Sequence, residues 1–270
     1  MKRFLNSFIS FILAANTLNV VGSPAEAQSL PRQNDPEMGW RHTITPYLFL
    51  PFTTEGTSEI DGIEADIDLS LSDILDILQG AASVRYEGWN GDWGIQAELY
   101  HVYIGEDGTL PGPLATDVEL DIKQTYFSFQ GAYRFANGSN AAGHRYAADV
   151  SFGVKWNRLK QEVNLTNAIG RRTIGGTEEW FEPMVGIRYG LELNKDWRAV
   201  ARAELSGFGI NGDDLQYLVL LGVDWRAWEN MNLRFGYQFY GIDFSTERSN
   251  GGFAYDVNQN GPYLGLAIHF

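Results

Sequence analysis

The 270-residue sequence contains no cysteine, only 9 prolines and few basic residues. Without cysteine, no disulfide framework can hold an exported fold together. The 20 lysines and arginines stand against 34 aspartates and glutamates, giving a formal net charge of −14. This charge argues against nucleic acid as a partner, because its phosphates would be repelled. After residue 28, no stretch approaches the ~18 unbroken apolar residues that a membrane helix needs.

The first 28 residues are typical of an export signal. Lys2 and Arg3 form a charged start, an apolar segment follows over 8–15, and Ala25-Glu26-Ala27 is a small-x-small cleavage site. We expect 1–27 to be a cleaved signal peptide, 28–42 a polar periplasmic lead-in and 43–270 a single domain. An amphipathic N-terminal helix of the mature protein is the alternative.

Aromatic residues and glycine are abundant, with 8 Trp, 13 Tyr, 16 Phe and 30 Gly. From Thr43 onward, apolar and polar residues alternate, which is typical of strands with two different faces. In 180–193, for example, Phe181 and Ile187 share one face and Glu182 and Arg188 share the other. The same alternation occurs in 44–52, 93–99, 125–135, 150–156, 197–208, 217–225 and 233–239.

Alternation fits a soluble barrel or sandwich with an apolar interior, and it also fits a membrane barrel with its apolar face toward lipid. Run length favours the membrane barrel. Most runs exceed the ~5–6 residues of soluble strands and reach the about 9–11 that a tilted membrane strand needs.

Link lengths and aromatic residues also favour a membrane barrel. Short links at 91–92, 194–196 and 229–230 alternate with longer ones at 53–80, 105–117, 160–176, 209–214 and 246–252, as in bacterial outer-membrane barrels. Only the link 136–144 is long for its place. Several aromatic residues lie on the apolar face beside the short turns. We expect them to form a periplasmic aromatic girdle: Trp93, Tyr133, Phe135, Trp197 and Trp225.

The sequence therefore predicts an all-β fold, a transmembrane antiparallel up-and-down β-barrel of about ten strands, with 8 or 12 possible. A short helix is expected over 70–80 in the first long loop, since Leu71, Ile74, Leu75 and Leu78 have helical spacing. This helix would either pack over the barrel mouth or plug the lumen. Acidic residues precede it from Glu55 to Asp68, and we interpret them as a solvated loop, with neither metal nor cofactor expected.

The last ten residues, 261–270, place Leu264, Leu266, Ile268 and the terminal Phe270 at every second position. This run resembles the C-terminal signature of Gram-negative outer-membrane proteins, which the barrel-assembly machinery recognises. The whole chain is similar to the small uncharacterised outer-membrane β-barrel proteins of Proteobacteria, with matching segments at 45–49, 71–76, 91–94 and 261–266. The resemblance implies a porin-like barrel in the cell outer membrane, in contact with lipid and lipopolysaccharide, and implies no particular activity.

If the apolar faces meet lipid, the other faces place charges of both signs in the lumen. The predicted luminal charge network comprises Arg85, Glu98, Arg188, Glu192, Arg198, Arg202, Glu204, Asp224, Arg226 and Arg234. Register around the short turns pairs Arg85 with Glu98, Glu192 with Arg198, and Asp224 with Arg234. A ten-stranded barrel is only slightly wider than the eight-stranded kind that side chains fill, so we expect a narrow, charge-filled lumen.

A structural or adhesive, surface-interacting protein is the favoured function, and a narrow selective channel for small solutes is the alternative. A barrel hydrolase is a third possibility. Of the four histidines, only His101 is expected on a strand near the outer rim, and no catalytic motif surrounds it. We therefore expect no enzyme activity. The sequence does not identify an extracellular ligand.

Overall fold

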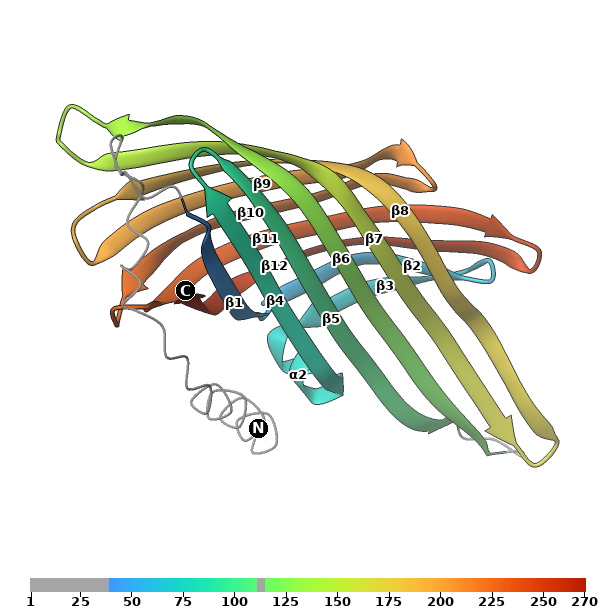
Figure 1. Ribbon diagram of the computed structural model, residues 1–270. Coiled ribbons are helices and arrows are strands. Elements are labelled where there is room, and N and C mark those ends of the chain that lie inside the picture. Colours follow the sequence, from blue (N-terminus) through green and yellow to red (C-terminus); the bar gives the residue numbers. More distant parts are fainter. Residues whose placement is uncertain (1–38, 111–114) are drawn as a thin grey trace.

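Figure 1 shows a computed structural model that describes residues 39–110 and 115–270, almost all of them in strands. The elements are β1 (Arg41–Phe49), β2 (Thr53–Ile60), β3 (Ile63–Ser70), α2 (Leu71–Ile77), β4 (Leu78–Asn90), β5 (Trp93–Leu110), β6 (Thr116–Ser139), β7 (Arg145–Asn167), β8 (Gly170–Glu192), β9 (Trp197–Ile210), β10 (Asp213–Arg226), β11 (Met231–Arg248) and β12 (Gly251–His269). Within the described ranges, no helix is long and apolar enough to cross a membrane. The expected signal peptide and the lead-in up to residue 38 lie outside them.

The strands form a closed antiparallel ring. β1 pairs with β4, each strand from β4 to β11 pairs with the next along the chain, and β12 pairs with β1, so that ten strands close the barrel. At the closure, Thr43 lies opposite His269 on one side and opposite Glu87 on the other. The backbone of Phe270 exchanges hydrogen bonds of 2.9 and 3.0 Å with His42. The predicted up-and-down barrel of about ten strands is confirmed.

Between β1 and β4, the chain departs from a simple up-and-down path. β1 and β2 both pair with β12, so they act as one long strand broken around Pro51, which has no N–H to donate. The chain then returns through a two-residue turn in which Asp61 and Gly62 both have positive φ, the geometry of a tight β-hairpin. β3 pairs with β2, α2 follows, and β4 resumes beside β1.

α2 begins at a complete N-terminal cap. The Ser70 side chain accepts a hydrogen bond from the Asp73 backbone, and the Asp73 carboxylate accepts one of 2.9 Å from the Ser70 backbone. This reciprocal pair satisfies donors that a helix start otherwise leaves free. The link expected over 53–80 is therefore a hairpin followed by a helix at 71–77, and the helix packs against β3 and β5.

Three links expected to be long loops, 160–176, 209–214 and 246–252, are instead the ends of strands joined by two-residue turns. β6, β7 and β8 are 24, 23 and 23 residues long, and β7 passes to β8 through residues 168–169 alone. The sequence prediction was wrong here because it depended on alternating hydropathy. In the outer part of β7, Arg158 and Lys160 point outward while Asn157, the apolar Leu159 and Gln161 point inward, so the apolar outward face that marked the predicted runs is missing although pairing continues.

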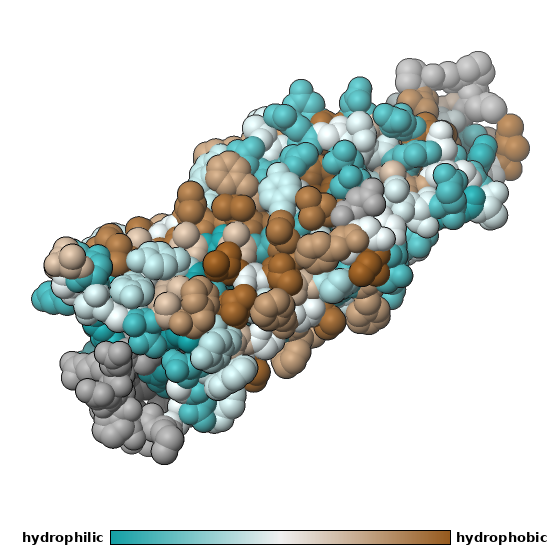
Figure 2. Space-filling model, turned by 90° about the horizontal axis from the view of Figure 1, so that it is seen from above, coloured by the Kyte–Doolittle hydropathy of each residue, from teal (hydrophilic) through white to brown (hydrophobic). Residues whose placement is uncertain are grey.

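A belt of exposed apolar side chains surrounds the middle of the barrel. It includes Leu99, Phe127, Phe129, Phe152, Val154, Phe181, Ile187, Leu205, Leu221, Phe235, Phe239 and Leu264. The belt is continuous across strands, since Phe127 lies opposite both Leu99 and Trp156. On the face drawn in Figure 2, hydrophobic residues gather across the middle of the molecule and hydrophilic ones lie toward both ends. Exposed apolar surface of this extent marks contact with lipid or with other proteins.

Candidate functional site in the barrel lumen

The luminal site is built from residues that strand alternation directs inward near the short turns. Arg85 on β4 lies 2.5 Å from Glu98 on β5 and 3.2 Å from Glu87, and it donates to Gln96 at 2.6 Å. All four side chains are buried. Charges removed from water in this way are stable only with close partners of opposite sign, and each of the three charged groups has one.

Ion pairs also connect opposite walls of the ring. Arg188 on β8 lies 2.5 Å from Glu87 on β4, and Arg202 on β9 lies 3.0 Å from Glu98 on β5. Arg85 on β4 lies 3.4 Å from Glu204 on β9. In the order of the ring, β4 and β9 are diametrically opposed. Side chains therefore span the whole lumen at this level and close it.

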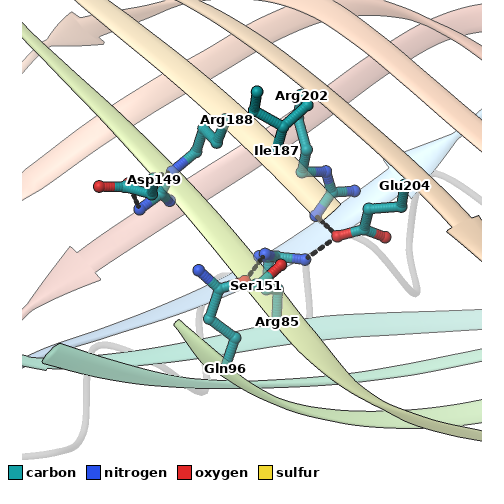
Figure 3. A pocket seen from close by; sticks show the side chains of 8 residues that line it. All are labelled: Arg85, Gln96, Asp149, Ser151, Ile187, Arg188, Arg202 and Glu204. Carbon is teal, nitrogen blue, oxygen red and sulfur yellow. Dashed lines mark hydrogen bonds and ion pairs between the residues drawn. The ribbon is translucent and has the colours of Figure 1, made fainter. Parts of the chain in front are cut away.

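The space that remains among these groups is very small. Figure 3 shows Arg85 and Arg202 approaching Glu204 from two sides, with Asp149 and Arg188 nearby. The gap has a volume of about 10 Å³, which is room for about one water molecule. Tyr47 and Tyr126 donate hydrogen bonds of 2.5 and 3.2 Å to Glu98 and fill its remaining surroundings.

Nearer the short turns, the network continues around Asp149. Arg134 lies 2.8 Å from this carboxylate and Arg188 lies 2.7 Å from it. The Arg134 guanidinium also lies 4.4 Å from the centre of the Trp89 ring, a cation–π contact. Elsewhere in the ring, Arg234 on β11 pairs with Asp224 on the adjacent β10 at 3.2 Å. The charged layer thus extends toward the periplasmic end expected from the sequence.

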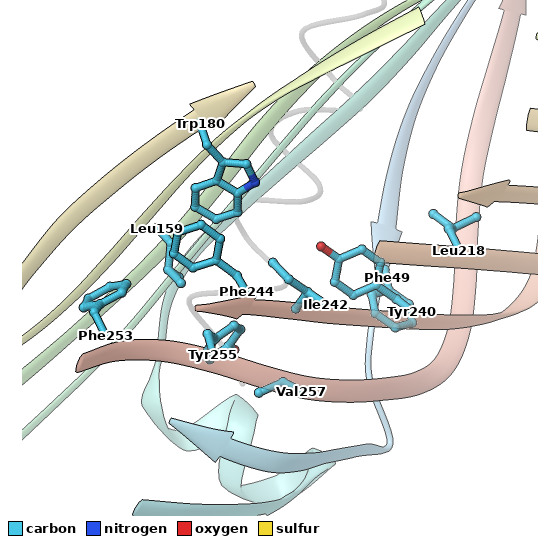
Figure 4. Close-up of a cluster of buried hydrophobic side chains, with 10 residues drawn as sticks. All are labelled: Phe49, Leu159, Trp180, Leu218, Tyr240, Ile242, Phe244, Phe253, Tyr255 and Val257. Atoms are coloured by element: carbon cyan, nitrogen blue, oxygen red, sulfur yellow. The ribbon is translucent and has the colours of Figure 1, made fainter. Parts of the chain in front are cut away.

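A second, apolar layer fills the barrel farther from the short turns. Figure 4 shows its side chains: Phe49, Leu159, Trp180, Leu218, Tyr240, Ile242, Phe244, Phe253, Tyr255 and Val257. Trp180 on β8 stacks on Phe244 on β11 with ring centroids 3.8 Å apart. Gln161 on β7 donates to the Ala254 carbonyl on β12 at 3.3 Å, and Ser58 on β2 hydrogen-bonds to Gln161. The interior is therefore filled at two successive levels.

The residues expected in the luminal network are placed as follows. Arg85, Glu98, Arg188, Arg202, Glu204, Asp224 and Arg234 take part in the contacts above. Arg198 lies opposite both Glu192 and Asp224 in the register, as expected, and Glu192 also forms an ion pair with Arg145 at 3.8 Å. Arg226 is half-buried at the end of β10.

Sequence reasoning missed the roles of Tyr47, Tyr126 and Trp89 in this site. Apart from the terminal phenylalanine, the only aromatic side chains given a role from the sequence were those of the expected lipid-facing girdle. The available signal was parity, since Tyr126 shares the inward face of β6 with Ser128 and Gln124. A tyrosine on the same strand face as polar residues therefore indicates a hydroxyl directed into the lumen.

The expected girdle residues lie exposed at the short-turn end of the barrel. Trp93 packs on Tyr133 with centroids 4.8 Å apart, Trp197 stacks on Trp225 at 5.9 Å, and Phe135 is exposed on the same side as Tyr133. At the C-terminus, Leu264 and Phe270 are exposed, with Leu266 and Ile268 half-buried between them on the same face.

His101 contacts Thr125 on the neighbouring strand, with 2.8 Å between the ring nitrogen and the hydroxyl. It has the outward parity of Leu99, away from the luminal charges. Across the part of the chain that the structure describes, no group of three or more His, Asp or Glu residues is placed to hold a metal ion.

No protein-family model matches the chain, and no curated protein matches it. Several solved structures are similar to it. Ail, the attachment invasion locus protein of Yersinia pestis, is 11% identical, with 86% of this chain and 100% of that chain covered and a TM-score of 0.37. The translocator domain of the autotransporter NalP from Neisseria meningitidis is 12% identical, with 86% and 89% covered and a TM-score of 0.42. The outer membrane protein OprG from Pseudomonas aeruginosa is 12% identical, with 85% and 95% covered and a TM-score of 0.31. At this level of likeness, none of the three indicates what this chain binds.

Proposed function

We propose that this chain is an outer-membrane barrel with a closed lumen, which serves a structural or adhesive role at the cell surface. The observation that carries the proposal is the set of ion pairs between opposite walls, above all Arg188–Glu87 and Arg202–Glu98. A wall-to-wall network of buried charges leaves no path for hydrated solutes and stiffens the barrel as a support.

The apolar belt supports a position in the membrane. Along β8 and the residue after it, exposed apolar residues extend from Phe181 to Leu193. At about 3.3 Å per residue and about 45° of tilt, this stretch rises about 28 Å, close to the apolar band of about 25 Å on outer-membrane barrels. The inward charges and outward apolar residues invert the arrangement of a soluble protein.

The long strands support a role in surface interaction. β6, β7 and β8 have more than twice the about 9–11 residues that a membrane strand needs. Their outer parts project beyond the belt as a paired sheet, which carries exposed ion pairs such as Arg158–Glu179 at 3.5 Å. A stiff projecting sheet presents a defined surface to partners outside the cell.

A narrow channel is the alternative function, because its selectivity filter would use the same luminal charges. Conduction would require the Arg188–Glu87 and Arg202–Glu98 pairs to separate. The side chains of the apolar layer would also have to move apart. Planar-bilayer recordings distinguish the two functions, since a closed lumen gives no unit conductance.

Surface exposure can be tested with single cysteines, because the chain has none of its own. Ile169→Cys introduces a thiol in the exposed β7–β8 turn, and Lys195→Cys introduces one in a short turn at the opposite end. A membrane-impermeant maleimide should label position 169 on intact cells and position 195 only after lysis. Labelling of neither position until lysis would contradict a surface role, and labelling of position 195 alone would reverse the orientation.

A further inference from the structure

The outer edge of β3 has no strand beside it. Among the described strands, β3 pairs with β2 alone and ends the strand order of the sheet. On the other side of the break, the pairing of β5 with β4 ends at Ile104, so that 105–110 pairs only with β6. Figure 1 shows the β2–β3 hairpin and β5 diverging from α2. The barrel wall is therefore incomplete at its outer end.

The backbone groups of three β3 residues point to this free edge. The Leu71 N–H donates to the Phe52 carbonyl at 3.1 Å, which identifies these two residues as a hydrogen-bonded pair of the hairpin. In an antiparallel ladder such pairs alternate, so Ile63, Ala65, Ile67 and Leu69 bond to β2. The N–H and C=O groups of Glu64, Asp66 and Asp68 are left to point outward, and all three residues are exposed.

The side chains at this edge carry unbalanced negative charge. Residues 53–70 contain six carboxylates and neither lysine nor arginine. Across the hairpin, Glu59 lies directly opposite Glu64 and Glu55 directly opposite Asp68. Like charges facing each other on neighbouring strands are destabilising, so the hairpin would gain stability from cations supplied by another molecule.

The hairpin lies in water, beyond the lipid belt. On the part of β12 that pairs with β2, the outward face carries the polar residues Asp256, Asn258 and Asn260 beside the small Ala254. An unpaired strand edge could not persist in hydrocarbon, but beside these residues it is open to a dissolved partner.

We infer that the β3 edge binds an extended, cationic polypeptide segment of another protein, which adds to the sheet as a strand. Backbone groups would pair with the free edge, and lysines or arginines at every second position would meet Glu64, Asp66 and Asp68. The residues between them would be apolar, because Ile63, Ala65, Ile67 and Leu69 form the other face of β3. A second copy of this chain would bring an equally acidic edge and is repelled, as is anionic lipopolysaccharide. This inference rests on the proposed function for its outward orientation.

The test uses the full barrel refolded in zwitterionic detergent and a fluorescent eight-residue peptide that alternates lysine and valine. Anisotropy titration should show tighter binding than for a peptide with four lysines followed by four valines, which has the same charge. Asp66→Asn removes one charge and keeps the outward N–H, whereas Asp66→Pro removes both and leaves the β2 pairing intact. The proline variant should bind about fivefold to tenfold more weakly than the asparagine variant.

Heat-dependent gel mobility would confirm that both variants fold. Equal binding of the two peptides, or equal binding by the two variants, would overturn strand addition and leave only charge attraction. A peptide-free dimer that Asp66→Pro dissociates would instead assign the edge to a second copy. Peptide binding in detergent does not depend on conductance or on orientation in cells, so this inference and the proposed function can fail separately.

Discussion

Glu98 concentrates the chemistry of the lumen in one side chain. It accepts hydrogen bonds from Arg85, Arg202, Tyr47 and Tyr126, and it is almost inaccessible to water. Its pairing with Arg85 follows from sequence, because both residues point inward beside one short turn. Its contact with Arg202 does not, since alternation gives the face of a residue and says nothing about which strand lies across the ring.

Replacement of Glu98 by alanine should strongly destabilise the barrel. The change leaves two buried guanidinium groups without their shared partner, which typically costs about 3–5 kcal/mol. The control is Glu179→Ala, whose pair with Arg158 is about half exposed and should contribute at most about 1 kcal/mol. Urea unfolding in lipid vesicles, followed by tryptophan fluorescence, measures both. Similar losses for the two variants would show that the luminal network is solvated.

Single strands show how far alternation predicts structure and where it stops. On β6, alternation located the segment 125–135 and its lipid face, and the strand in fact runs from Thr116 to Ser139. The missing outer length has no apolar outward face, because Asp117, Glu119 and Lys123 point outward while Val118, Leu120 and Ile122 share the inward parity of Tyr126. β2 and β3 were missed because the acidic residues between Glu55 and Asp68, which are unusual in strands, were interpreted as a solvated loop, although Ile63, Ala65, Ile67 and Leu69 alternate with acidic residues on β3. α2 was found because the helical spacing of its apolar residues is a local signal.

Two phenylalanines of β6 can test whether the belt contacts lipid. Phe129 and Phe135 are similarly exposed, at 48% and 53%, but Phe129 lies mid-belt and Phe135 lies near the short turns. Phe129→Arg should cost about 2–4 kcal/mol in bilayers and Phe135→Arg about 0–1 kcal/mol, because the cost of charge depends on depth. Reversible folding into vesicles gives both values. Equal costs would mean that the belt is covered by protein or water.

The closed ring is a property of the whole molecule that depends on contacts far apart in sequence. The terminal run and the aromatic girdle predicted a barrel, but the pairing of β1 with β12 joins residues more than two hundred positions apart. Alternation could not show that β2 continues the pairing with β12, that β3 pairs with β2, or that the pairing of β5 with β4 ends at Ile104. The two filled layers of the lumen likewise depend on which strands face each other across the ring.

Single-channel recording in planar bilayers tests the central claim, a membrane-spanning barrel with a closed lumen, most directly. The protein would be reconstituted at a density at which an open porin, recorded in the same lipid, gives regular steps. With Arg188–Glu87 and Arg202–Glu98 spanning the lumen and Trp180 stacked on Phe244 above them, we predict no steps beyond the protein-free baseline. Reproducible steps of uniform size from the wild-type protein would contradict the closed lumen and favour the selective channel.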